Sequence, residues 1–300
     1  MKIALTDVLG ILLAMVAAAL PTSAAAAITC TLNAPAVLNF VYVSGTNSTN
    51  PSNKIQSQVT AVCQRNLATD PTTAQLYLGA NDGLQPAASV NKAVFGANGV
   101  SYNLWRNVAC VGQFRDTTNT TRIAANFAST ALSPVNVTFD YWACIPGQTV
   151  SSFPAGVYTD SVSLFLRNTA GLQLATASIP VNITAPARCA ISGGPGNITF
   201  VYNAFGSANF QFTNFSADCT NGLPYTMDVS PAAGVVGGLR YELGLSDTAG
   251  SATNIGPASL SRVGGATGSR PHVINGVMVA NQAGVLGAIV AQPHTLTITY

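Results

Sequence analysis

The sequence predicts an all-β protein built from two related domains in tandem, and three observations support this prediction. Only 7% of the 300 residues are charged, whereas Val, Thr, Asn and Ser are frequent, which is typical of secreted β proteins. Short segments in which polar and apolar residues alternate recur along the chain, as expected of strands that bury one face. A series of motifs in the first half also returns in the same order in the second half, which indicates a duplicated domain.

The composition disfavours several classes of function. Twelve Lys and Arg against ten Asp and Glu give a formal net charge of +2, so the chain has no basic surface for nucleic-acid phosphates. The chain has a single Glu, Glu242, and two His, so few side chains are available as acids or bases. Hydrophobic residues make up 48% of the chain, which is enough to bury a sizeable core. Binding to nucleic acid and long disordered regions are therefore not expected.

The N-terminus has the pattern of a secretory signal peptide over residues 1–27. Lys2 provides a positive charge, residues 8–20 form an apolar run, and residues 25–27 fit a small-residue cleavage site. The apolar run is shorter than the about 20 residues that a membrane-spanning helix needs. A buried helix is the alternative interpretation. We expect the protein to be exported through the periplasm.

Six cysteines follow the predicted cleavage site, and an even number in an exported chain indicates disulfides. None of them belongs to a C-x-x-C pair and no His lies at ligand spacing beside them, so a zinc site is disfavoured. Their number alone leaves many connectivities open. The six residues are Cys30, Cys63, Cys110, Cys144, Cys189 and Cys219.

The repeated motifs justify the two-domain prediction in detail. Each copy begins with a Cys, at Cys30 or Cys189, followed by a short Pro-containing stretch and the tripeptide Phe-Val-Tyr. An alternating segment then leads to a second Cys, at Cys63 or Cys219. The Phe-Val-Tyr tripeptides are residues 40–42 and 200–202. A shared Tyr-x-Leu begins at Tyr102 in the first copy and at Tyr241 in the second. Each copy closes with an alternating segment, residues 161–166 in the first and residues 295–300 in the second.

The repeat also selects among the disulfide connectivities. The two cysteines that open each copy occupy equivalent places and are 33 and 30 positions apart. The two that remain would form a bridge found only in the first domain. Each bridge of this size is expected to stabilise its domain by about 3–4 kcal/mol. The predicted pairs are Cys30–Cys63, Cys189–Cys219 and Cys110–Cys144.

The two copies differ at their C-terminal ends. The first continues past its closing segment through residues 172–185, whose alternation predicts one further strand, and then through a short linker. The second ends at Tyr300, inside its closing segment. We therefore place the first domain at residues 28–185 and the second at residues 186–300, and expect the second to lack its final strand.

A missing final strand has a physical consequence for the second domain. Leu296, Ile298 and Tyr300 alternate with threonines, so one row of side chains is expected to line the core beside the missing strand. These three residues would then border an open apolar groove. Because a bare strand edge associates with other strands unless it is covered, we expect another chain to pair there.

Several of these segments resemble the spore coat protein U-like domain of archaic, Csu-type chaperone–usher pilus subunits. The resemblance covers almost the whole chain after the predicted signal peptide. In the second domain it rests on the Phe-Val-Tyr between the two cysteines, and in the first on AGVYTDSVSLFL at residues 155–166. The other second-domain segments are LRYELGLSD at residues 239–247, VMVANQ at residues 277–282 with Gly284 and Gly287, and HTLTITY at residues 294–300.

The resemblance implies a fold of two immunoglobulin-like β-sandwich domains, the C-terminal one lacking its last strand. In this family a periplasmic pilus chaperone fills the gap first, and the N-terminal extension of the adjacent pilin subunit replaces it at the outer-membrane usher. Cys30 lies only two residues after the expected new N-terminus, so no donor segment is expected and the subunit would cap the fibre.

The layout is similar to that of the family's tip adhesins, in which the first domain binds surfaces. The resemblance therefore implies an extracellular adhesin at the pilus tip that attaches cells to abiotic or host surfaces and supports biofilm formation. The alternative is a free secreted β-sandwich protein that binds glycans through polar loops such as residues 43–55.

Two apolar loops of the first domain are the predicted contact surface. Residues 84–99 have no match in the second domain, and residues 145–155 follow a cysteine. Exposed apolar side chains gathered on loops would mark an interaction site, although the same side chains could fold into the core. The candidate residues are Leu84, Val94, Phe95, Ile145, Val150 and Phe153.

No catalytic, metal-binding or cofactor motif is found. His272 and His294 are interpreted as edge or loop residues, because neither stands at helical spacing from another ligand. Residues 264–268 are Gly-rich but are not followed by Lys, so a phosphate loop is not supported. The aspartates form no close pair in sequence, and a glycosidase site is not expected. We expect a protein that is not an enzyme and has no cofactor.

Overall fold

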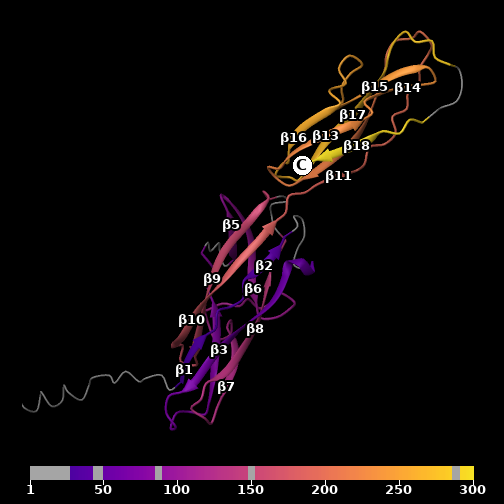
Figure 1. The fold of residues 1–300 in the computed structure, drawn as a ribbon. Coiled ribbons are helices and arrows are strands. Elements are labelled where there is room, and N and C mark those ends of the chain that lie inside the picture. Colours follow the sequence, from indigo (N-terminus) through magenta and orange to yellow (C-terminus); the bar gives the residue numbers. More distant parts are fainter. Residues whose placement is uncertain (1–27, 43–49, 85–89, 148–152, 286–290) are drawn as a thin grey trace, which may run out of the picture.

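The structure is a computed structural model that describes residues 28–42, 50–84, 90–147, 153–285 and 291–300 (Figure 1). Apart from one 3-10 turn, η2 (Pro51–Asn53), every regular element in these ranges is a strand. Within the same ranges, no helix is long and apolar enough to cross a membrane. The predicted signal peptide and Val150 lie outside the described residues.

The first ten strands form one continuous, curved sheet system. Its main path runs β1-β3-β8-β6-β5-β9-β10-β2, and β4 joins it by pairing with β9 and β7. All pairs are antiparallel except β10 with β2, which is parallel. The strands are β1 (Ile28–Leu32), β2 (Leu38–Val41), β3 (Lys54–Arg65), β4 (Thr73–Ala80), β5 (Asn91–Phe95), β6 (Asn98–Trp105), β7 (Ile123–Ala128), β8 (Val135–Cys144), β9 (Gly156–Asn168) and β10 (Gln173–Ala185).

The remaining strands form two smaller sheets that share a second core. One has the order β11-β12-β17-β15-β14 and the other the order β16-β13-β18. The strands are β11 (Cys189–Ser192), β12 (Asn209–Cys219), β13 (Pro224–Ser230), β14 (Ala233–Val236), β15 (Leu239–Ser246), β16 (Ser259–Val263), β17 (Ser269–Met278) and β18 (Thr295–Thr299). The all-β prediction is therefore confirmed.

The pairing scheme of the first set of strands returns in the second. β1 pairs with β3 and β3 with β8, just as β11 pairs with β12 and β12 with β17. β6 pairs with β5 and β8, as β15 pairs with β14 and β17. β4 lies between β7 and β9, as β13 lies between β16 and β18. The sequence repeat is thus a repeat of strand pairing.

The alternation read from the sequence decides which side chains fill the two cores. Along β9 every second residue from Tyr158 to Leu166 is buried, and the residues between them are more exposed. Tyr102 and Tyr241, matched in the repeat, are both buried on equivalent strands. Each fully buried large side chain contributes about 1.5–3 kcal/mol of burial free energy. The two cores share no residue, and residues 186–188 link the strands on either side.

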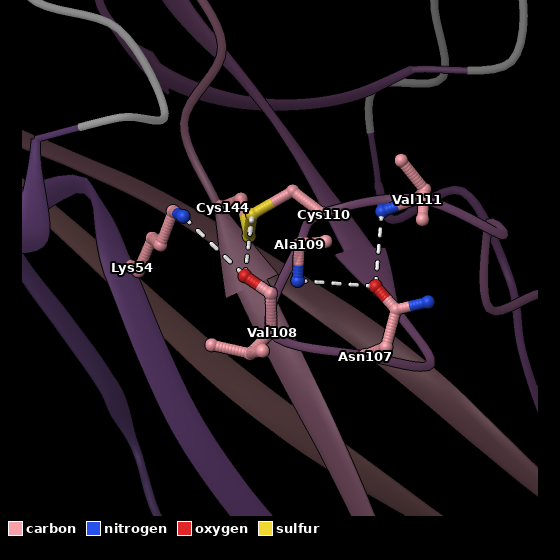
Figure 2. Close-up of a disulfide and its surroundings, with 7 residues drawn as sticks. All are labelled: Lys54, Asn107, Val108, Ala109, Cys110, Val111 and Cys144. Carbon is pink, nitrogen blue, oxygen red and sulfur yellow. Dashed lines mark hydrogen bonds between the residues drawn. A yellow bond between two sulfur atoms is a disulfide. The ribbon is translucent and has the colours of Figure 1, made fainter.

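Three disulfides join the same pairs that the sequence predicts. Cys30–Cys63 and Cys189–Cys219 cross-link paired residues of neighbouring strands at equivalent places. Cys110–Cys144 differs, because it attaches a loop to the end of β8 (Figure 2). The Asn107 side chain accepts hydrogen bonds from the backbone amides of residues 109 and 111, at 3.1 and 3.3 Å, and so shapes this loop before the disulfide anchors it.

The loop bridge should stabilise the first domain alone. Replacing both cysteines, Cys110→Ala with Cys144→Ala, removes a cross-link over 34 positions and should lower the free energy of unfolding of that domain by about 3–4 kcal/mol. Urea unfolding of the full chain under oxidising conditions measures this change. The unfolding of the second domain serves as the internal control and should not move. Equal stability of the variant and the original first domain would contradict the prediction.

Candidate functional site

β10 completes the first core by lying between two strands that would otherwise have free edges. It pairs antiparallel with β9 along its whole length and parallel with β2 near its end. Three alternate side chains of β10, Ile179, Val181 and Ile183, are fully buried. They cover Leu38 and Phe40 of β2, which are 1% exposed. β10 therefore supplies both the last hydrogen-bonded edge and an apolar row of the core.

In the second domain, none of the described strands occupies the place that corresponds to β10. Among the described residues, β18 pairs with β13 alone, whereas the equivalent β9 pairs with both β4 and β10. Residues 198–202, which match β2 in the repeat, form no strand. We call the place between β18 and residues 198–202 the open strand position.

Apolar side chains line both sides of this open strand position. They pack against the second core but remain only partly buried, unlike their counterparts in the first domain. Because the alternate residues Thr295, Thr297 and Thr299 are exposed, the apolar row of β18 points to the core. Tyr300 is 59% exposed. The partly buried residues are Ile198, Phe200, Tyr202, Leu296 and Ile298.

A tyrosine orients the chain before β18, as another does in β9. In the first domain the Tyr102 hydroxyl donates to the buried Asp160 carboxylate at 2.8 Å. In the second, the Tyr241 hydroxyl lies 2.7 Å from Nε2 of His294, whose Nδ1 lies 2.6 Å from the Pro231 carbonyl. Since a carbonyl only accepts, Nδ1 of His294 donates to the Pro231 carbonyl. His294 therefore holds the start of β18 and is not free to bind a metal.

The described candidate residues of the two predicted contact loops differ in their exposure. Leu84 and Phe95 are exposed, Val94 is half-buried in β5, and Ile145 and Phe153 are 0% and 4% exposed. The prediction is wrong for Ile145 and Phe153.

The structure gives the physical reason for this burial. The backbone amide of residue 145 donates to the Asn53 carbonyl at 2.9 Å, which turns its side chain inward. Phe153 packs edge-on against Tyr42 and Tyr158, with ring centroids 5.9 and 6.2 Å away. A backbone bridge also joins Pro154 to Asn221 of the second domain. Pro154, in the described part of this loop, therefore contacts the second domain.

A different set of loops forms the end of the first domain that lies away from the second (Figure 1). Each of three loops, residues 66–72, 129–134 and 169–172, presents one leucine that is about half or more exposed. The exposed leucines are Leu67, Leu132 and Leu172, at 61%, 48% and 52%. Leu67 and Leu132 lie between alternating segments and carry no motif, and Leu172 was assigned to the strand predicted over residues 172–185, so the sequence did not mark the three as one group.

Arg65 holds two of these loops together. Its guanidinium donates to the carbonyls of Thr130 at 2.9 Å and Asp70 at 3.0 Å, and it also reaches the Ala68 carbonyl. The Asp70 carboxylate in turn accepts from the backbone amide of Leu67 at 2.6 Å. Because backbone groups of these two loops are satisfied in this way, Leu67 and Leu132 are presented on a fixed frame. We call Leu67, Leu132 and Leu172 the outer leucines.

About half of the chain matches the profile of a known family. The profile of the Spore Coat Protein U domain matches residues 16–164. The first domain is a Spore Coat Protein U domain. The match ends within β9, so the relationship of the second domain to the same family stays a prediction.

Solved structures of low sequence identity are similar over most of the chain. One is the chaperone–tip adhesion subunit complex CsuC–CsuE of Acinetobacter baumannii, at 13% identity and a TM-score of 0.44, covering 91% of this chain and 100% of that one. Another is the CupB6 tip adhesin of Pseudomonas aeruginosa, at 8% identity and a TM-score of 0.41, covering 91% and 93%. A third is CfaE, the adhesive subunit of CFA/I fimbria of enterotoxigenic Escherichia coli, at 10% identity and a TM-score of 0.31, covering 89% and 97%. No curated protein matches the chain.

Aspartates of both domains form ion pairs within the fold. Asp116 of the Spore Coat Protein U domain pairs with Arg122 at 2.7 Å and Arg167 at 2.6 Å. Asp247, in the second domain, borders an open pocket of about 470 Å³ and is the only carboxylate that lines it. Within the described ranges no three His, Cys, Asp or Glu side chains are placed to hold a metal ion. We find no acid pair in this pocket that could act on a glycan.

His272 is the clearest departure from the sequence interpretation. The sequence predicts an edge or loop residue. In the structure His272 lies in β17, which is flanked by β12 and β15, and is fully buried. Its Nδ1 lies 3.0 Å from the Asp247 carboxylate and its Nε2 lies 2.8 Å from the Tyr225 hydroxyl. Arg262 and Arg270 also bond to Asp247. The core accommodates this polar ring because both of its nitrogens have partners, Tyr225 in β13 and Asp247 directly after β15.

Burial and the two arginines together set the charge state of this cluster. Burial lowers the pKa of His272, and the neighbouring arginines add to this effect, while the charge and hydrogen bond of Asp247 oppose it. For Asp247, burial alone would raise the pKa, but the hydrogen bonds and charges of Arg262 and Arg270 bring it below its usual value. The folded cluster therefore contains a neutral imidazole and an ionised carboxylate.

The second domain should lose stability as the pH falls. The folded pKa values of His272 and Asp247 both lie below their ordinary values of 6.5 and 3.8, so their contributions are complete above those values. Below them the unfolded chain takes up protons more readily than the folded chain, and acid favours unfolding. Calorimetry of the full chain from pH 7 to pH 3.5 should show the unfolding temperature of the second domain falling, first from near pH 6.5.

His272→Gln provides the matched comparison, since its side chain does not titrate. The variant should start at a lower stability but show a flatter profile between pH 7 and pH 5. An equally steep profile in the variant, or a flat profile in the original protein, would refute the assignment to His272.

Proposed function

We propose that this protein is the tip adhesin of an archaic chaperone–usher pilus, and that its second domain accepts a strand from another polypeptide. The observation that carries the proposal is the difference between the two copies of one fold. In the first, β10 fills the place between β9 and β2. In the second, the described residues leave the corresponding place open and its apolar lining partly exposed. The Spore Coat Protein U domain at residues 16–164 is consistent with this role.

β10 shows what an incoming strand would contribute. A strand of the same pattern would pair with the free edge of β18 and place three alternate apolar side chains on the second core. Burying three such side chains contributes roughly 5–9 kcal/mol before the cost of ordering the strand. Main-chain pairing of this kind is a general mode of peptide recognition. We propose that a periplasmic chaperone provides the strand first, and that the adjacent pilin subunit replaces it at the outer-membrane usher.

We further propose that the outer leucines make the contact with surfaces. We assign the contact to the outer leucines and no longer to the loops at residues 84–99 and 145–155. The reason is that the outer leucines lie at the end of the molecule away from the second domain. Exposed apolar side chains gathered at one end are typical of interaction sites. Apolar contact of this kind does not depend on a particular receptor, and it suits attachment to abiotic or host surfaces and biofilm formation. The protein would act outside the cell after export through the periplasm.

A strand peptide should stabilise the second domain. Adding a synthetic peptide of the β10 sequence, Gln173–Ala185, to the full chain made in an oxidising periplasm should raise the unfolding temperature of the second domain by roughly 10 °C or more. A peptide with Ile179, Val181 and Ile183 replaced by Ser should have no effect. Differential scanning calorimetry reports the transitions of both domains, and the first should not change.

Two variants of β18 sharpen this test. Ile298→Asp places a charge in the row that points to the core and should abolish the response to the peptide. Thr297→Asp places the same charge in the exposed row and should leave the response intact. A second domain that is stable alone and ignores both peptides would favour the free secreted glycan-binding protein instead.

Removing the outer leucines should reduce attachment without affecting assembly. Each leucine is exposed, so Leu67→Ser, Leu132→Ser and Leu172→Ser together should change folding stability by little. If each contributes about 1 kcal/mol of apolar contact, attachment strength should fall by roughly a hundredfold. Counting pili and attached cells on plastic measures both quantities. The matched control is Leu84→Ser with Phe95→Ser, which removes exposed apolar side chains away from the outer end; attachment lost only in this control would reverse the assignment.

A further inference from the structure

The second domain exposes apolar side chains at the end opposite the linker. Val201, Phe205, Val235 and Val285 are each between 61% and 78% exposed. They come from three segments joined by backbone hydrogen bonds: the amide of Phe205 donates to the Gln282 carbonyl, and the amide of Val285 donates to the Gly237 carbonyl, both at 2.8 Å. β14 and β15 mark this end in Figure 1. We call the four residues the far-end patch.

Phe205 is held outward in a conformation that a bulky residue rarely adopts. Its φ of +57° lies in the left-handed region, which is costly for a side chain of this size. The turn around it is fixed on both sides: the amide of Asn281 donates to the Gly206 carbonyl at 3.0 Å, and the Tyr202 hydroxyl accepts from the amide of Gln282 at 2.9 Å. The fold thus maintains strain and gains no core burial from Phe205, which indicates that the exposed ring has a use.

The first domain shows where the chain goes after a strand that completes a domain. β10 runs to Ala185, and after residues 186–188 the second domain begins. At that point the two bodies touch, through the bridge between Pro154 and Asn221. Thr220 holds the linker, because its hydroxyl accepts from the amide of Arg188 at 3.0 Å. A strand followed by a folded body therefore brings that body against the end of the domain it completes.

The same geometry applies to the open strand position. β18 runs from Thr295, opposite Ser230, to Thr299, opposite Thr226, and so towards the linker end of the domain. A strand antiparallel to β18, as β10 is to β9, would run the other way and leave the domain at its far end. The chain that follows such a strand emerges beside residues 198–202 and the far-end patch.

We infer that the far-end patch is the docking surface for the folded body of the polypeptide whose strand fills the open strand position. This inference rests on the proposed function and identifies a second contact with the same partner. The partner is a protein with an extended apolar segment followed closely by a compact domain, whose first surface is apolar enough to cover Phe205 and Val285. The strand supplies main-chain pairing, and the patch fixes the angle between successive bodies.

Site-specific photo-crosslinking in pilus-bearing cells tests this inference. Benzoylphenylalanine is placed at Ile298, in the open strand position, at Phe205, in the far-end patch, and at Val263, an exposed residue at the linker end of the domain. We expect Ile298 to crosslink to the extended segment of one polypeptide and Phe205 to crosslink to the folded part of that same polypeptide, in yields several times those at Val263. Mass spectrometry of the crosslinked peptides identifies both positions.

The outcomes separate this inference from the proposed function. No crosslink from Ile298 to another polypeptide would overturn the proposed function itself. A crosslink from Ile298 with none from Phe205, or one from Phe205 to a second copy of this chain or to an unrelated protein, would overturn the docking surface alone.

A pair of surface variants gives a second measurement. Phe205→Ser with Val285→Ser should leave the temperature shift with the β10 peptide unchanged, because neither residue belongs to the open strand position. The same variant should recover several times less of the polypeptide trapped at Ile298. Equal recovery would count against the docking surface.

Discussion

The structure depends most on how β10 covers the first core. It gives both β9 and β2 a hydrogen-bonded neighbour and supplies three fully buried side chains to the space between them. Without β10, β2 would have no paired neighbour among the described strands. The tight burial of Leu38 and Phe40 follows from this single strand, since the matching Ile198 and Phe200 of the second domain remain partly exposed where no such strand is present.

The two domains are two versions of one strand arrangement within a single chain. Both domains share most of their strand pairings and the disulfide that joins their first two strands. In each, a buried tyrosine also bonds to the segment of the closing strand, Tyr102 to Asp160 and Tyr241 to His294. The difference that bears on the proposed function lies at one position in the sheet, where β10 pairs in the first domain. Leu296 and Ile298 are only partly buried, whereas the same domain buries Met227 and Leu245 completely.

Sequence reasoning succeeded where local pattern and duplication decide the outcome. Period-2 alternation identified β9, β10 and β18, and the repeat indicated all three cysteine pairs. It failed where the direction of a side chain depends on distant strands. Ile145 and Phe153 look like apolar loop residues, but Asn53, Tyr42 and Tyr158 draw them into the core. His272 looks like an edge residue until β13, β15 and β16 bring Tyr225, Asp247 and Arg262 around it. The outer leucines share no sequence motif that groups them, because what they have in common is the end of the domain that they occupy.

The direction of the strands also gives the molecule a line along which tension can pass. The outer leucines lie at one end of the first domain, and β10 runs from that end to the linker. Thr220 fastens the linker to the second domain, and β11, which follows, is cross-linked to β12 by Cys189–Cys219. A load applied at the outer end would thus enter the second domain at a covalently secured strand. A donor strand running towards the far end would carry the load onward along its paired length, so that many ladder hydrogen bonds share it. An apolar contact at the far-end patch would then keep the next body in line with that pull.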